Sequence, residues 1–238
     1  MSRIEDALSK ARQLDERAAA PTLPMPAPAV EPPAGLAELF PIRTNLQFAL
    51  AGIAHPVVVF CSAVPKEGVT TVVYHLARLL AADKRTLVID ANFPNPRMHE
   101  LFRTSNGRGL SDLVVEKKTL EECVTATTHP NLDLMTSGPA ASAAHWFLGS
   151  PAAGEILERC SAGYGIVLID APPLRVSPDT AVLGSHADGV VLVVRAGKTS
   201  RDVLRYARGL LDNAGARQLG VILNRMKLWV PDFIYRRL

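Results

Sequence analysis

The stretch Val57–Leu80 constrains the fold more than any other part of the chain. Val57–Cys61 is a short apolar, β-branched run, which predicts a strand covered on both faces. The turn Pro65–Gly68 ends that strand, and from Thr70 onward apolar residues recur at the spacing of one helical face. A strand, a tight turn and a helix N-terminus together predict a phosphate-binding loop, because backbone N–H groups and the helix dipole then face an anion.

This loop is close to a Walker A motif but has no lysine before its threonines. The motif needs glycine, lysine and then Ser or Thr at the start of the helix, and the chain has Gly68, Val69, Thr70 and Thr71. Val69 brings no ammonium group to the phosphates, and a charge-assisted hydrogen bond of that kind is worth about 1.5–3 kcal/mol. We therefore expect weakened nucleotide binding. The alternative is an ordinary strand–turn–helix that binds nothing.

Two other predicted strands end in an acid, at Asp90 and at Asp170. Acidic side chains at strand carboxyl ends lie at the ligand edge of an open α/β sheet. The run GIVLID (165–170) is typical of a Walker B strand, whose carboxylate holds magnesium or its water shell. For Asp90 alone, a helix cap or turn residue is the alternative.

The remaining elements alternate between strand and helix, which predicts an α/β fold with a doubly wound, mostly parallel sheet. Further predicted strands are Leu132–Met135 and two buried ones, Val190–Arg195 and Leu219–Asn224. Predicted helices are Leu36–Leu50, His99–Phe102, Leu110–Val115, Leu120–Val124, Pro151–Cys160 and Ser200–Asn213.

The two ends differ in composition from the central domain, 36–226. Ser2 and Glu5 form a capping box for an amphipathic helix within 1–17. Residues 18–35 hold six prolines among alanines, as in a semi-rigid linker. A capped helix on a stiff tether predicts a docking peptide, with a frayed tail as the alternative. The tail 227–238 is basic and aromatic, which suits a membrane surface, but Pro231 favours a strap packed on the domain.

Composition bounds the class of protein. With 48% hydrophobic and 21% charged residues among 238, the chain is globular. A net charge of +3 is too weak to predict a nucleic-acid partner. Three scattered cysteines predict a reducing cytosol. Because no apolar run approaches a bilayer span and no signal peptide begins the chain, a membrane role would come through a partner or a surface contact.

Nine collinear segments between Leu36 and Arg225 resemble the bacterial tyrosine autokinases of capsule and exopolysaccharide synthesis, which share the fold of MinD/ParA-type ATPases. The opening MSRIEDAL resembles the start of the family's separately encoded kinases, which work beside a membrane-anchored chain-length (co-polymerase) protein. The nine segments are RTNLQF (43–48), SAVPKEGVTT (62–71), TLVIDANFPNPRMHELF (86–102), GLSDLV (109–114), NLDLMTSGP (131–139), LGSP (148–151), YGIVLIDAPP (164–173), ADGVVLVVRAGKTSRD (187–202) and GVILNR (220–225).

The resemblance implies a set of site residues. Asp90 and Asp170 are the implied catalytic acids, and Tyr235 is the implied phosphoacceptor. ATP or ADP with Mg²⁺ is the implied cofactor where nucleotide binding survives; otherwise there is none. The implied nucleotide-binding residues are Lys66, Glu67, Gly68, Val69, Thr70, Thr71 and, near the adenine, Asn224. The implied metal ligands are Thr70, Asp90, Asn92 and Asp170.

The chain departs from the family pattern at residues that set the charge of this site. Val69 replaces the lysine, Lys66 replaces a glycine, and Asn92 replaces an acid. The tail has one tyrosine, and the family's oligomerisation helix, aligned on Arg43, has Ala37 and Phe40 at its other two positions.

We therefore predict a catalytically impaired relative that serves polysaccharide assembly as a regulatory or assembly partner of the co-polymerase. It would be cytoplasmic and peripheral at the inner membrane, docked through the helix in 1–17, with a homo-oligomer as a further expected partner. The alternatives are an active autokinase that uses Lys66, and a MinD/ParA-like positioning ATPase that uses the basic tail.

Overall fold

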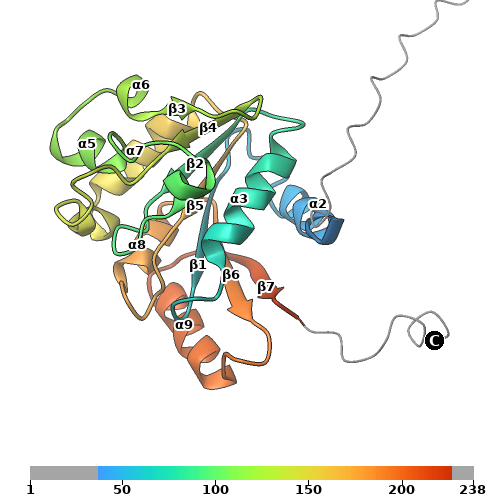
Figure 1. Ribbon diagram of the computed structural model, residues 1–238. Helices are drawn as coiled ribbons and strands as arrows, with labels where there is room; N and C mark the ends of the chain where they lie inside the picture. The colour runs from blue at the N-terminus through green and yellow to red at the C-terminus, as the bar shows by residue number, and fades with distance from the viewer. Residues whose placement is uncertain (1–36, 227–238) are drawn as a thin grey trace, which may run out of the picture. The chain divides into compact units, whose positions relative to one another are not determined.

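A seven-stranded, mostly parallel sheet forms the centre of the protein (Figure 1). The computed structural model describes residues 37–226. The strand order is β3-β4-β2-β5-β1-β6-β7, and all neighbouring pairs run parallel except β3 and β4. The strands are β1 (Val57–Ser62), β2 (Thr86–Asp90), β3 (Thr125–Ala126), β4 (Leu132–Met135), β5 (Ile166–Asp170), β6 (Gly189–Arg195) and β7 (Gln218–Asn224).

Helices cover both faces of this sheet (Figure 1). Local sequence signals explain where several of them begin: Pro41 lies in the first turn of α2, and the Ser200 hydroxyl accepts a hydrogen bond from Val203 N at 3.3 Å at the start of α9. The helices are η1 (Ala37–Leu39), α2 (Phe40–Ala49), α3 (Val69–Leu80), α4 (Met98–Leu101), α5 (Leu110–Val115), α6 (Leu120–Cys123), η2 (His145–Gly149), α7 (Ala152–Ser161), α8 (Asp179–Ser185) and α9 (Arg201–Asn213).

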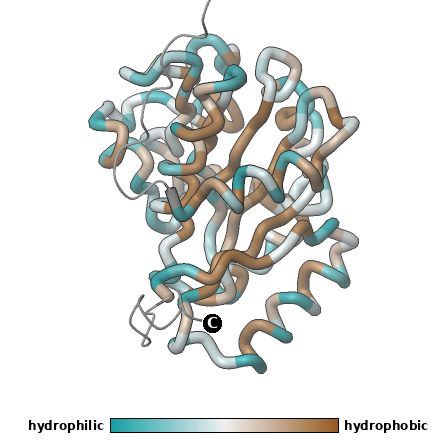
Figure 2. The backbone as a smooth tube through the Cα atoms, turned by 90° about the vertical axis from the view of Figure 1, so that its right-hand side faces the viewer, coloured by the Kyte–Doolittle hydropathy of each residue, from teal (hydrophilic) through white to brown (hydrophobic). Residues whose placement is uncertain are grey.

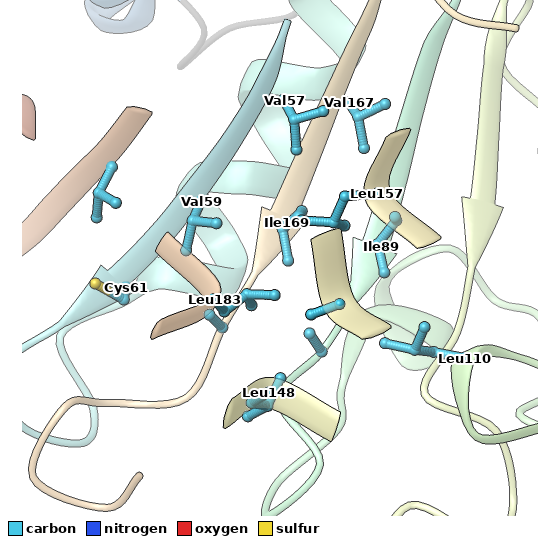
Figure 3. Close-up of a cluster of buried hydrophobic side chains, with 14 of the residues drawn as sticks. Val57, Val59, Cys61, Ile89, Leu110, Leu148, Leu157, Val167, Ile169 and Leu183 are labelled. Atoms are coloured by element: carbon cyan, nitrogen blue, oxygen red, sulfur yellow. The ribbon is translucent and has the colours of Figure 1, made fainter. Parts of the chain in front are cut away.

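An apolar core lies on each face of the sheet, because successive strand side chains point to opposite faces. Val57 and Val59 of β1 join the core that also holds Leu157 of α7 and Leu183 of α8 (Figure 3). Phe60 joins the other core, which includes α2 and α3. The central strands are therefore hydrophobic along their length, as the brown segments of Figure 2 show. This is expected for a parallel sheet covered on both faces.

The predicted doubly wound α/β fold is confirmed, with two corrections. The strand predicted as buried at Leu219–Asn224 is instead an edge strand, β7, in which Val221 and Leu223 are 49% and 60% exposed because only β6 pairs with it. The predicted helix at Leu36–Leu50 begins as the separate 3₁₀ turn η1. Neither α8 nor the two-residue, antiparallel β3 was predicted.

The topology fixes where a ligand would bind. Strand β1 lies between β5 and β6, so the chain winds to one side of β1 and later to the other. Open α/β sheets bind ligands at the carboxyl ends of the strands at such a switch point. Within residues 37–226, no helix is both long and apolar enough to cross a membrane.

Candidate functional site

The predicted phosphate loop connects β1 to α3 at this switch point. Gly68 is the N-cap of α3 and has φ of 93°, and Lys66 has φ of 70°. Left-handed backbone is costly for a lysine, at about 1–2 kcal/mol, so the turn does require the conformation that glycine adopts freely. The N–H of Val72 donates to Gly68 O at 3.1 Å. The N–H groups of the preceding positions form the anion-facing end of the helix.

Asn224, at the end of β7, holds the loop in place. Its Nδ2 donates a hydrogen bond to Glu67 O at 2.8 Å. A Cβ atom at Gly68 would collide with that same amide nitrogen. Asn224, which is predicted to lie near the adenine, thus contacts the loop backbone, and this contact gives Gly68 a second reason to be glycine besides its positive φ.

The Glu67 side chain is turned into the protein and is 2% exposed. Its Oε1 accepts a hydrogen bond from the Thr199 hydroxyl and one from Arg195 N at 3.4 Å, whereas Oε2 has no partner within the described domain. Glu67 therefore anchors the loop to the connection between β6 and α9. Sequence reasoning missed Thr199, because next to Ser200 it has only the appearance of a helix-start residue.

Val69, at the Walker A lysine position, lies in the apolar core. Its side chain is 8% exposed and belongs to the core that α3 forms with α2 and the sheet. The backbone of Val69 stays in the loop, at the first residue of α3. Lys66, by contrast, is exposed. The loop thus keeps its shape and its helix N-terminus, while the side chain that would meet phosphate is hydrophobic.

Asp90 and Asp170 are register partners at the carboxyl ends of β2 and β5, and both are fully buried. Asp90 Oδ2 accepts hydrogen bonds from Arg97 N at 3.0 Å and Met98 N at 2.9 Å, and Oδ1 accepts one from Asn92 N at 3.2 Å. Burial raises the pKa of Asp90, and these hydrogen bonds oppose the rise. Asp90 therefore caps the start of α4, which is the structural alternative considered for it, while also lying beside the second acid.

Asp170 is in the opposite situation. Neither of its carboxyl oxygens has a hydrogen-bond partner among residues 37–226. Burial, followed by the charge of Asp90, raises its pKa well above the ordinary range, and the Thr70 hydroxyl opposes that rise. Asn92 Oδ1 is also buried without a partner in the described chain. Free carboxylate, amide and hydroxyl oxygens are the ligands that magnesium takes, so Thr70, Asn92 and Asp170 fit such an ion.

The structure thus brings the predicted residues together at one edge of the sheet. Thr71 is exposed in the first turn of α3. The predicted phosphoacceptor Tyr235 and the predicted segments 1–17, 18–35 and 227–238 lie outside the described residues. Arg43, the retained position of the family's oligomerisation helix, forms an ion pair with Asp83 of the same chain.

No protein-family profile matches the chain. It is 35% identical over 188 residues to the tyrosine-protein kinase YwqD of Bacillus subtilis strain 168, and the match covers 79% of each. It is 32% identical to the tyrosine-protein kinase wzc of Salmonella typhimurium strain LT2, but it spans only 26% of that protein.

Solved structures agree with these relatives. The chimerical protein CapA2B2 is 30% identical, with a TM-score of 0.74 over 84% of this chain and 88% of that one. The septum site-determining protein MinD of Pyrococcus horikoshii OT3, at 18% identity, shares the fold with a TM-score of 0.61 over 76% of each chain. The chain therefore belongs to the bacterial tyrosine autokinase family, which has the P-loop α/β fold.

Proposed function

We propose that the chain is a catalytically impaired tyrosine-autokinase-like protein of capsule or exopolysaccharide synthesis and export. It acts as a regulatory or assembly partner of a membrane-anchored chain-length (co-polymerase) protein. The observation that carries the proposal is the burial of Val69, 8% exposed in an apolar core, at the position where the family's loop has its lysine.

The charge balance of the site supports impairment. Glu67, Asp90 and Asp170 are all buried around the loop. ATP would bring further negative charge to them, and no lysine at position 69 balances it. Mg²⁺, held by Thr70, Asn92 and Asp170, would neutralise part of the charge and polarise a phosphate. Because electrostatic stabilisation dominates phosphoryl transfer, the missing cation costs more in catalysis than in binding.

An active autokinase is the second candidate, and Lys66 is the observation that favours it. This lysine is exposed in the loop three residues before Val69. Its left-handed backbone keeps the loop in the conformation that the glycine of the family pattern would adopt at this position. In this second reading, the Lys66 ammonium reaches the phosphates in place of the missing group.

Incubation with radiolabelled ATP and Mg²⁺ separates the two candidates. The proposal predicts that the full chain takes up no more label than its Asp170→Asn variant, which lacks the free carboxylate. Transfer of label at an ordinary kinase rate, lost in Tyr235→Phe, would instead establish the active autokinase.

Docking through the N-terminal helix is the part of the proposal that concerns the partner. It rests on the capping box and the proline-rich linker of the sequence. The test is co-purification of the full chain with a membrane-anchored chain-length protein from the same organism, compared with a chain that begins at Gly35. Loss of co-purification only in the shortened chain supports docking by 1–17, and equal recovery of both chains contradicts it.

A further inference from the structure

A hollow away from the phosphate loop lies among three segments, at a place that the proposed function does not use. Its volume is about 260 Å³. Its lining comes from α3, from the end of α4 and from the turn that precedes β4: Tyr74, Leu101, Phe102, Arg103, Thr128 and His129. Residues 128 and 129 precede the amino end of β4, whereas Asp90 and Asp170 lie at the carboxyl ends of their strands. The hollow and the phosphate loop are therefore separate sites.

Aromatic rings form one wall of this hollow. Tyr74 and Phe102 meet edge to face, with ring centroids 4.8 Å apart, and Phe102 and His129 do so at 6.5 Å. The Arg78 guanidinium carbon lies 5.3 Å from the Tyr74 ring centroid. An arginine over a tyrosine face is a cation–π arrangement, which fixes the cation beside an apolar surface. The hollow thus has an aromatic wall, with Arg103 in its lining and Arg78 packed on the Tyr74 ring.

Positive charge around the hollow is not balanced by acids. Within residues 37–226, neither Arg78 nor Arg103 takes part in an ion pair. Burial, and then the charge of Arg78, lowers the pKa of both His75 and His129, with no carboxylate opposing it. Arg78 Nε and His75 Nδ1 are buried and lack partners in the described chain. An unpaired guanidinium donor such as Arg78 Nε favours an anion that accepts several hydrogen bonds.

The size of the hollow limits the ligand to a fragment. Pockets for drug-sized ligands begin at about 300 Å³, so this one suits a single side chain or a molecule of similar size. A second hollow of about 130 Å³ adjoins it, shares Phe102, Arg103 and Thr128, and continues beside β3 through Thr125 and Ala126. If the bound side chain belongs to a peptide, its neighbouring residues would therefore contact the second hollow.

We propose that this hollow binds an aryl phosphate, the chemistry of a phosphotyrosine side chain. The ring of the ligand would lie against Tyr74 and Phe102, and its phosphate would meet the guanidinium groups of Arg78 and Arg103. Arginine clusters are the usual readers of phosphorylated side chains, because their donors match phosphate oxygens in a fixed geometry. The site is separate from the loop, so the proposal stands whether or not the chain binds ATP.

The test is a titration of the ¹⁵N-labelled full chain with phenyl phosphate, followed by amide NMR shifts. We expect saturable shifts at Phe102–Thr104 and Thr127–His129, with weaker binding of inorganic phosphate and of benzoate. Arg78→Gln and Arg103→Gln should each weaken phenyl phosphate binding about tenfold, the effect of one lost charge-assisted hydrogen bond. The matched control is Arg205→Gln on α9, which should bind as the wild type does.

Several results would overturn the proposal. Saturable shifts confined to Gly68–Thr71 would place the phosphate in the loop instead. Equal affinity for inorganic phosphate would show that the ring contributes nothing, and equal affinity for benzoate would show that phosphate is not what is recognised. An absence of saturable shifts at millimolar phenyl phosphate would likewise refute it.

Discussion

Asp90 and Asp170 are neighbours in register on β2 and β5, yet one carboxyl group is fully hydrogen-bonded and the other has no partner in the described domain. The two acids, both implied as metal ligands by the family resemblance, therefore have different tasks in the structure. Asp90 secures the start of α4, and Asp170 is free for a cation. Substitutions at the two positions should consequently change stability in opposite directions.

Asp170→Asn should increase the free energy of unfolding at neutral pH by about 1–3 kcal/mol, because it removes a buried, unpaired carboxyl group. Burial raises the folded-state pKa of Asp170 above its ordinary value of 3.8. The protonated form thus favours folding at low pH, and this contribution is lost as the pH rises through the folded-state pKa. Thermal melts at several pH values should show a gain for Asp170→Asn that grows as the pH rises above about 4.

The control for that series is Asp202→Asn, whose carboxylate is 88% exposed on α9. Its melting temperature should differ little from wild type across the same range, because exposed ion pairs contribute about 0–1 kcal/mol. A gain for Asp170→Asn that does not change with pH would contradict the assignment of a raised pKa to Asp170.

Asp90→Ala should decrease the free energy of unfolding by about 2 kcal/mol or more, because it leaves the buried N–H groups of Asn92 and Met98 without an acceptor. Relief of the repulsion with Asp170 offsets only part of this loss. Urea denaturation of the purified variant measures the change. A variant as stable as the wild type would show that the hydrogen bonds to Asp90 do not hold α4.

Gly68→Ala and Gly52→Ala form a matched pair, since their φ values are 93° and 89°. A Cβ at Gly52 meets nothing within 4 Å, whereas one at Gly68 meets the amide of Asn224. Gly52→Ala should cost about 1–2 kcal/mol from backbone strain alone. Gly68→Ala should cost at least about 1 kcal/mol more, from the collision and the lost bond to Glu67 O. Equal losses in urea denaturation would exclude the close approach of Asn224.

Lys66→Ala tests whether the exposed loop lysine replaces the missing one. Lys117→Ala is its matched control, because Lys117 is also exposed and has a positive φ, 53° compared with 70° for Lys66. Under the proposed function, neither variant changes the heat released on titration with ATP and Mg²⁺. Binding by the wild type that is lost only in Lys66→Ala would establish the active-autokinase alternative.

Much of the fold follows from local sequence patterns. The run TLVID predicts β2 within about one residue because the centre of a fully buried strand is apolar, and the helix-face spacing after Gly68 predicts α3. The edge position of β7 could not be predicted, since GVILN reads like a central strand. Only the strand order shows that β7 has a single neighbour.

The site was predicted only in part, for a similar reason. The positions of Gly68, Asp90 and Asp170 follow from strand ends and motif spacing. The hydrogen bonds of Thr199 to Glu67 and of Asn224 to the loop join residues 132 and 157 positions apart, so no local pattern reports them. The unequal hydrogen bonding of the two acids also depends on the path of the loop after β2, which brings Arg97 N and Met98 N back to the Asp90 carboxylate.

The most direct test of the central claim is a calorimetric titration with ATP and Mg²⁺ of the wild type and of Val69→Lys, with Val115→Lys as a charge control on the surface. Val69 is buried, but a lysine stem can lie along apolar surface while its ammonium reaches the loop. The proposed function predicts very weak or no binding by the wild type and by Val115→Lys, and at least about tenfold tighter binding by Val69→Lys. Tight, magnesium-dependent binding by the wild type, with no gain in Val69→Lys, would contradict it.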